Sequence, residues 1–401
     1  MAPLNLNDPI YDVGGGRRLS VQDLLTVFSE RGAMRVSDLH MKVGRPPVYR
    51  IDGDLQSTQM PPLDAATIEA AARRLLAEAE FERLRTQKAV DGSLLQENLQ
   101  FRLNIFHDCN GLAIAVRALE AGAPEVEELG FPNQVWSDIV NRQAGLVLVT
   151  GITGAGKSTT IASLIRRIAE THPCRIITLE DPIEYRLASA RSLVSQREVG
   201  RDVPNYETGL RDCLREDPDV IFVGEMRDRD STSWTLTAAE TGHLVFSTLH
   251  TRDARGTITR ILDMYPPDRQ EEVASQLSLG LAYVICQKLV PRTDGAGRVA
   301  AMEILQNSYA VANLIRLRKT EQLYSVMQTQ TKDTAPERMV TLERSLAELV
   351  GTGVLNALEA EKWANHPSTF VDELKRIQEG TPAPPPDRPS DSRRRRPTPE
   401  P

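Results

Sequence analysis

Eight consecutive residues near the middle of the chain have the types and spacing of a phosphate-binding loop. Residues 151–158 read GITGAGKS and fit the pattern G-x-x-x-x-G-K-[ST]. Glycines let the backbone wrap closely, so that successive N–H groups can face phosphate oxygens. Lys157 would reach the β- and γ-phosphates, and the Ser158 hydroxyl would bind Mg²⁺. The predicted nucleotide contacts are Gly151, Thr153, Gly154, Ala155, Gly156, Lys157, Ser158 and Thr159.

Acidic residues follow two apolar runs further along the chain. RIITLE ends in Glu180, with Asp181 and Glu184 just beyond it, and VIFVG is followed directly by Glu225. A bound triphosphate needs metal ligands and a group that positions water, and both come from the carboxyl ends of neighbouring strands. We expect Glu225 and Glu184 to be catalytic, and Glu180 and Asp181 to join Ser158 at Mg²⁺. A solvated surface turn is the alternative for Glu180 and Asp181.

Two histidines flank the apolar run LVFSTL. His243 and His250 are seven residues apart, so they lie at the two ends of a strand or on its opposite faces. They are therefore poor ligands for one shared metal ion. One or both would contact the γ-phosphate at the edge of a sheet, and a structural histidine is the alternative.

The elements that must position these residues begin at Gly145. Short apolar runs, GLVLVT, RIITLE, VIFVG and HLVFSTLH, alternate with helical segments, a pattern that predicts a parallel sheet covered on both faces. The candidate phosphate loop follows the first run and opens the helical stretch STTIASLIRRIAE. After Pro266 helices dominate, with a predicted hairpin of LVPRT and RVAAMEIL.

A smaller α+β region precedes this sheet. VQDLLTVFSERG has helical spacing, VYRIDGDL predicts a strand that turns at Asp52-Gly53, and FRLNIF and AIAVRAL predict further strands. TIEAAARRLLAEAEFERLR predicts one amphipathic helix. The predicted division is a flexible N-terminus (1–18), an N-terminal domain (19–120), a linker (121–133), an α/β domain with C-terminal helices (134–355), a terminal helical segment (356–379) and a disordered Pro/Arg-rich tail (380–401).

Composition restricts the functional class. The 401 residues carry a net charge of -7, so bulk affinity for nucleic acid is not expected. Neither a secretory signal nor an apolar run of the roughly 18–20 residues needed to span a membrane is found. The four cysteines form no C-x-x-C pair, which favours free core cysteines in a cytoplasmic protein.

Four segments resemble a known family. GITGAGKST, ITLEDPIEY, LREDPDVIFVGEMRD and AAETGHLVFSTLHT are similar to the Walker A, Asp-box, Walker B and His-box motifs of the secretion and type IV pilus ATPases. The resemblance runs from about Val36 to Val354 and is strongest to the PilT-type retraction ATPases of twitching motility. The chain lacks the larger N-terminal region and the tetracysteine module of the extension and type II secretion ATPases.

This resemblance implies a PAS-like N-terminal domain joined to a RecA-like motor domain, with six subunits in a ring and ATP held between the two domains. Glu184 would be the Asp-box acid and Glu225 the Walker B acid, while His243 and His250 would form the His-box pair. The resemblance also implies two partners: an inner-membrane pilus platform protein, to which the ring would dock at the inner face of the membrane, and a paralogous retraction ATPase. Two arginines of the N-terminal domain would help to bind phosphate, namely Arg102 and Arg117.

The chain departs from the family pattern at several positions. Ile152 and Ala155 replace Pro and Ser in the loop, which leaves the cradle intact. Asn110 stands where a third arginine is usual, and Ala312 replaces the first arginine of a C-terminal motif tied to retraction. Two alternatives follow: the ATPase of a type II or type IV secretion machine, and a nucleotide-gated accessory subunit without turnover. A nucleic-acid translocase is a third, which the acidic composition disfavours.

Overall fold

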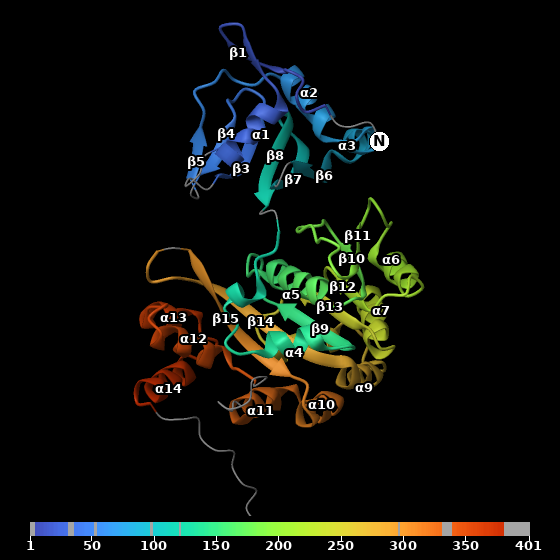
Figure 1. Cartoon of the computed structure of the whole chain (residues 1–401), viewed down its shortest axis with the longest axis vertical. Coiled ribbons are helices and arrows are strands. Elements are labelled where there is room, and N and C mark those ends of the chain that lie inside the picture. Colours follow the sequence, from blue (N-terminus) through green and yellow to red (C-terminus); the bar gives the residue numbers. More distant parts are fainter. Residues whose placement is uncertain are drawn as a thin grey trace, which may run out of the picture. The chain divides into compact units, whose positions relative to one another are not determined.

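A computed structural model describes residues 5–30, 36–51, 54–96, 99–119, 122–295, 297–330 and 339–380. The chain divides into two compact units, drawn in Figure 1. The first holds residues 1–123 together with Glu180–Leu187, and the second holds Pro124–Leu179 and residues 188–401. The finer domain boundaries stay predictions, and residues 381–401 of the predicted tail lie outside the described residues.

The N-terminal unit is built on an antiparallel sheet of six strands in the order β5-β4-β3-β8-β7-β6. Its long central pair, β7 and β8, carries the predicted strands FRLNIF and AIAVRAL, which are confirmed. Alternate residues of β7, including Phe101, Leu103 and Ile105, are buried in the core of this unit. The strands are β3 (Val36–Lys42), β4 (Val48–Ile51), β5 (Asp54–Ser57), β6 (Ala89–Gln96), β7 (Leu99–Asp108) and β8 (Gly111–Leu119).

Three helices pack with this sheet: α1 (Val21–Glu30), α2 (Ala65–Leu75) and α3 (Glu78–Gln87). The sequence predicted one helix where α2 and α3 stand, and that prediction was wrong. Leu76 has extended backbone and is 2% exposed, so the chain leaves the helix to bury this side chain. The carboxylate of Glu80 then accepts from the Ala77 N–H at 2.8 Å and stabilises the start of α3.

The expected flexible N-terminus also differs from the structure. Residues 11–19 form a hairpin of β1 (Tyr11–Gly14) and β2 (Arg17–Leu19). Three successive glycines at positive φ make the turn, and Asp12 accepts from the Gly14 N–H at 2.8 Å. Tyr11 is buried in the core and its hydroxyl donates to the Pro61 carbonyl. Burial of the Tyr11 ring stabilises the hairpin, and the polar, glycine-rich composition of this segment did not indicate it.

The second unit contains a seven-stranded sheet in the order β11-β10-β12-β13-β9-β14-β15. Strands β10, β12, β13, β9 and β14 are parallel, and β15 runs antiparallel to β14. This confirms the predicted parallel sheet and the predicted hairpin. The strands are β9 (Gly145–Thr150), β10 (Arg175–Glu180), β11 (Leu193–Glu198), β12 (Val220–Val223), β13 (Leu244–Leu249), β14 (Leu281–Pro291) and β15 (Arg298–Gln306).

Helices lie on both sides of this sheet in Figure 1, as the continuous apolar strands require. Helix α5 packs against β9, α7 against β13 and β9, and α8 against β14. These helices are α4 (Val135–Asn141), α5 (Lys157–Thr171), α6 (Tyr206–Cys213), α7 (Arg229–Glu240), α8 (Ala254–Asp263), α9 (Gln270–Gly280), α10 (Tyr309–Arg316) and α11 (Leu323–Gln330).

Three C-terminal helices bury a separate apolar cluster against β14 and β15. Val290 and Ala301 from the strands pack there with Leu342, Leu346 and Phe370. The helices are α12 (Leu342–Gly351), α13 (Ala357–Trp363) and α14 (Pro367–Gln378). These helices therefore cover the part of β14 and β15 around Val290 and Ala301.

Within the described ranges, none of the helices is both long and apolar enough to cross a membrane. All four cysteines are free. Cys213 and Cys286 are buried and Cys174 is half-buried, but Cys109 is exposed at the turn between β7 and β8. The prediction of core cysteines is thus wrong for Cys109, because a hairpin turn of this sheet projects into solvent.

Candidate nucleotide site

The phosphate loop joins the carboxyl end of β9 to the first residue of α5. Gly154 and Gly156 have φ of 78° and 87°, and Gly156 is the N-cap of α5. Gly151 has a φ of 146°, and a Cβ there would lie 2.5 Å from the Gln287 carbonyl oxygen. Three glycines thus allow a backbone path that side chains would block. The N–H groups at the start of α5 are left for an anion.

Lys157 lies within this loop. Its side chain is folded over the loop, since Nζ donates to the Gly151 carbonyl at 3.0 Å and to the Ile152 carbonyl at 3.3 Å. The residue is only 9% exposed. The ammonium group is therefore held at the mouth of the loop, where a phosphate chain would meet it.

Gln287 on β14 supports the loop, and the sequence analysis missed it. Its Nε2 donates to the Ala155 carbonyl at 2.5 Å, and its Oε1 accepts from the Thr160 hydroxyl at 2.9 Å. The side chain is 2% exposed, so both bonds are shielded from water. The available signal was a polar amide inside the apolar run LAYVICQKLV, which marks a buried group that must be hydrogen-bonded.

Glu225 and His250 come together at the carboxyl edge of the sheet. Glu225 follows β12 and His250 follows β13, and His250 Nε2 lies 3.5 Å from Glu225 Oε1. Arg227 donates to Glu225 Oε2 at 2.7 Å. These residues, with Arg260, line a pocket of about 260 Å³. Strand β9 lies next to β13, so this pair and the phosphate loop share one edge.

His243 lies at the other end of β13. Its Nδ1 is 3.0 Å from the Ala238 carbonyl and 3.1 Å from the Thr241 hydroxyl, so both neighbours are local. Six strand residues at about 3.3 Å each separate it from His250. The structure therefore separates His243 from the phosphate loop. The role predicted for His243 stays a prediction.

The Asp-box acids belong to the N-terminal compact unit. Glu184 is half-buried and Asp181 is exposed, while Glu180 is 7% exposed at the end of β10. The backbone of this segment is held where Gln100 Nε2 donates to the Ile183 carbonyl at 2.7 Å. The roles predicted for these acids stay predictions.

Arg102 and Arg117 stand directly opposite each other on β7 and β8. Arg117 donates to the buried carboxylate of Asp38 at 2.7 Å. Burial raises the pKa of Asp38, but hydrogen bonds from Ser37 and Arg117 outweigh it and leave the pKa below its usual value. Arg102 is exposed and makes no hydrogen bond or ion pair with any described residue. Arg102 is therefore available to a ligand, whereas Arg117 already holds a structural carboxylate.

Mg²⁺ would depend on few protein oxygens. The Ser158 hydroxyl is half-buried and makes no hydrogen bond within the part of the chain that the structure describes. No cluster of three or more His, Cys, Asp or Glu able to hold a metal alone occurs among the described residues. Mg²⁺ commonly takes one or two protein ligands and completes its shell with phosphates and water, so the residues present fit this ion.

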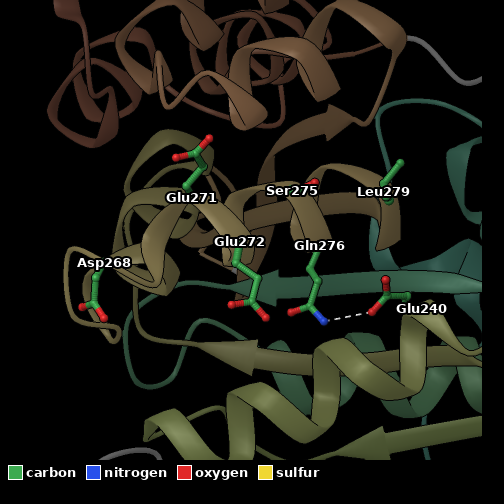
Figure 2. Close-up of a pocket in the computed structure, with 7 residues that line it drawn as sticks. All are labelled: Glu240, Asp268, Glu271, Glu272, Ser275, Gln276 and Leu279. Atoms are coloured by element: carbon green, nitrogen blue, oxygen red, sulfur yellow. Dashed lines mark hydrogen bonds between the residues drawn. The ribbon is translucent and has the colours of Figure 1, made fainter.

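A different groove, of about 600 Å³, lies on α9 and the end of α7 (Figure 2). Its acids are Glu240, Asp268, Glu271 and Glu272, and Gln276 donates to Glu240 at 2.9 Å. None of the described residues that line it is a lysine or an arginine. Like charge would repel a triphosphate, so this groove is not the nucleotide site despite its size.

Comparisons with known proteins agree with this geometry. Residues 21–354 match the family model of the "Type II/IV secretion system protein". The "Type IV pilus retractation ATPase PilT" of Pseudomonas aeruginosa is 39% identical over 353 residues, which cover 88% of this chain and 100% of that protein. A "Twitching motility protein" of Neisseria gonorrhoeae is 40% identical, covering 80% of this chain and 84% of its own.

A solved structure is similar over nearly the same length. The crystal structure of "the Pilus Retraction Motor PilT and Bound ADP" has a TM-score of 0.79 and 41% identity, and covers 86% of this chain and 98% of its own. The predicted fold class is thereby confirmed: an N-terminal α+β domain followed by a RecA-like P-loop domain with a helical C-terminal part.

Proposed function

The chain belongs to the type II/IV secretion system protein family, and from this premise we propose that it hydrolyses ATP to power retraction of a type IV pilus. The observation that carries the proposal is the shared edge of the sheet. A glycine-rich loop with a buried lysine lies there, and Glu225 and His250 follow the neighbouring strands. Relatives named as a retraction ATPase and a twitching motility protein favour retraction over secretion.

The terminal phosphoryl group of ATP is transferred to water. The loop amides and Lys157 hold the phosphate chain, and Ser158 is the protein ligand of Mg²⁺, with Glu180 and Asp181 as the proposed additional ligands. When bound, Mg²⁺ neutralises charge on the phosphates. Glu225 orients the attacking water, and His250 is placed beside it to contact the γ-phosphate side of the site. Glu184 assists from the Asp-box segment.

Arg227 orients Glu225. Its Nε donates to Glu225 Oε2 at 2.7 Å, which fixes the direction in which the carboxylate faces. The carboxylate acts mainly by positioning, because most of the barrier in phosphoryl transfer is lowered by alignment and charge stabilisation.

Steady-state ATP hydrolysis by the purified full chain tests the proposal. Lys157→Ala and Glu225→Gln should each lower turnover at least about tenfold, or about 1.4 kcal/mol in the barrier. Glu225→Gln should still bind a fluorescent ATP analogue, because the loop is untouched. Glu271→Gln makes the same charge change in the exposed acidic groove and should leave turnover unchanged.

Two outcomes would change the conclusion. Near-normal turnover in Glu225→Gln would remove this carboxylate from the mechanism. A wild-type chain that binds ATP without hydrolysing it would identify a nucleotide-gated accessory subunit instead. Deletion of the gene should abolish twitching, and loss of secretion with intact twitching would assign the motor to a secretion machine.

We further propose a homo-hexameric ring in the cytoplasm that docks on a pilus platform protein at the inner face of the membrane. Head-to-tail contacts that close by rotation would form such a ring. Light scattering with and without nucleotide should detect it. A monomer with full activity at all concentrations would contradict the ring.

A further inference from the structure

A second pocket, of about 410 Å³, adjoins the start of the phosphate loop within the same compact unit. Gly151 and Ile152 form one wall, and β14 and the segment after α13 form the others. Among the residues that the structure describes, its charged lining residues all carry positive charge and none is a carboxylate. They are Arg252, Lys288 and Lys362.

Lys288 has hydrogen-bonding capacity to spare. Its Nζ donates to the Trp363 carbonyl at 2.7 Å and to the Asn365 Oδ1 at 2.8 Å, and both acceptors are neutral. An ammonium has three donors, so one is left. Burial lowers the pKa of Lys288, the charges of Glu343 and Glu303 offset part of that shift, and the charge of Arg252 lowers the pKa further. An anion in the pocket would stabilise the charged form.

Two more donors at this pocket lack an acceptor within the described part of the chain. Arg252 is exposed, and its guanidinium makes no hydrogen bond or ion pair with any residue in the described part of the chain. Its neighbour Asp253 is engaged elsewhere, since it accepts from the Gly256 N–H at the start of α8. Asn365 Nδ2 is buried and has no hydrogen-bond partner among the described residues. A buried amide donor without an acceptor is costly, which indicates that a ligand completes it.

Two acids whose charges act on Lys288, Glu343 and Glu303, already accept other hydrogen bonds. Glu343 accepts from the backbone N–H groups of Asn365 and His366 at 3.0 Å and 2.8 Å, and from the Tyr324 hydroxyl at 2.9 Å. Glu303 accepts from the Ala254 N–H at 2.6 Å. Each of these acids therefore already accepts a hydrogen bond from at least one residue outside the pocket lining.

We propose that Arg252, Lys288 and the Asn365 amide form a subsite for a tetrahedral phosphate oxyanion, next to the first residues of the phosphate loop. The inference rests on the ATP-hydrolysing function proposed above. Hydrolysis of ATP with one water yields ADP and inorganic phosphate, so two sources of this oxyanion exist. One is the terminal phosphate of bound ATP, and the other is the inorganic phosphate that leaves after cleavage.

Binding measurements on the full chain test this subsite. Inorganic phosphate is titrated into the nucleotide-free protein and into protein saturated with ADP and Mg²⁺, followed by ³¹P line broadening. Arg252→Gln and Lys288→Gln should each weaken phosphate binding at least about tenfold, the usual scale for loss of a charged hydrogen bond. The control is Arg255→Gln, an exposed arginine in the first turn of α8 that does not line the pocket.

A second arm separates the two sources. If the terminal phosphate of ATP occupies the subsite, both variants lose affinity for a non-hydrolysable ATP analogue and keep their affinity for ADP. If the product occupies it, only inorganic phosphate binding falls. Unchanged binding of both ligands in both variants overturns the proposal. Neither arm needs turnover, so a chain that binds phosphate here without hydrolysing ATP would refute the proposed function alone.

Discussion

Replacement of Gln287 by leucine should weaken nucleotide binding although Gln287 itself touches no nucleotide atom in our proposal. The change removes the two bonds that tie the phosphate loop and α5 to β14, those to the Ala155 carbonyl and the Thr160 hydroxyl. Both groups are then buried without a partner. Leucine fills a similar volume, so the effect reports mainly the lost hydrogen bonds.

The magnitude follows from the number of bonds. A buried polar group left unsatisfied costs about 1–3 kcal/mol, and two such groups give an upper range of about 2–6 kcal/mol. In the free protein, the loop can leave its binding conformation and thereby avoid part of this free-energy penalty. ADP must restore that conformation, so we expect a loss of about 2 kcal/mol, or about 30-fold, in ADP affinity. Thr160→Val removes one bond and should lose about fivefold.

Equilibrium binding of a fluorescent ADP analogue to the full chain measures both changes. Circular dichroism establishes that each variant is folded. The double variant should lose less than the sum of the two single losses, since both changes break the Thr160–Gln287 bond. ADP affinity within twofold of the wild type for a folded Gln287→Leu protein would refute this account of the loop.

The remaining predictions concern stability. Burial raises the pKa of Glu303 to about 8 from 4.5. The folded state therefore holds a proton that stabilises it fully below about pH 4.5 and is lost as the pH rises through about 8. The melting temperature should fall between pH 5 and pH 9 more steeply in the wild type than in Glu303→Gln, and equal slopes would contradict the buried proton. For the arginine pair on β7 and β8, Arg117→Ala should destabilise the protein by about 1 kcal/mol, because the buried Asp38 loses one charged partner and keeps the Ser37 hydroxyl and Arg50. The exposed Arg102→Ala should cost less than about 0.5 kcal/mol in thermal unfolding. The same melting temperature for both variants would show that the Asp38 pair adds nothing.

Local patterns predicted much of the motor domain. The glycines and lysine of residues 151–158 specify their own backbone path, so the loop was found without its neighbours. The continuous apolar runs correctly predicted buried parallel strands, because a strand covered on both faces has no polar side. Glu225 and His250 could be assigned to one edge, since both follow strands of the same direction.

Local sequence patterns could not predict hydrogen bonds and ion pairs between residues that are far apart in the sequence. Gln287 is 132 residues from Ala155 in the sequence, and no residue near Gln287 indicates that it contacts the phosphate loop. Asp38 is 79 residues from Arg117, so an arginine predicted for phosphate proved to be paired within its own sheet. His243 belongs to the same sequence motif as His250, but it precedes β13 and therefore lies at the amino edge of the sheet, opposite His250. The roles of Glu184, Glu180 and Asp181 stay predictions.

Strand β14 has a mechanical consequence for a motor. Its adjacent residues Gln287 and Lys288 project to opposite sides, the first holding the phosphate loop and the second holding the chain between α13 and α14. The phosphate loop and the segment from Trp363 to Asn365 are therefore hydrogen-bonded to neighbouring residues of one strand, so a shift of the loop on nucleotide binding would reach the C-terminal helices across a single peptide unit.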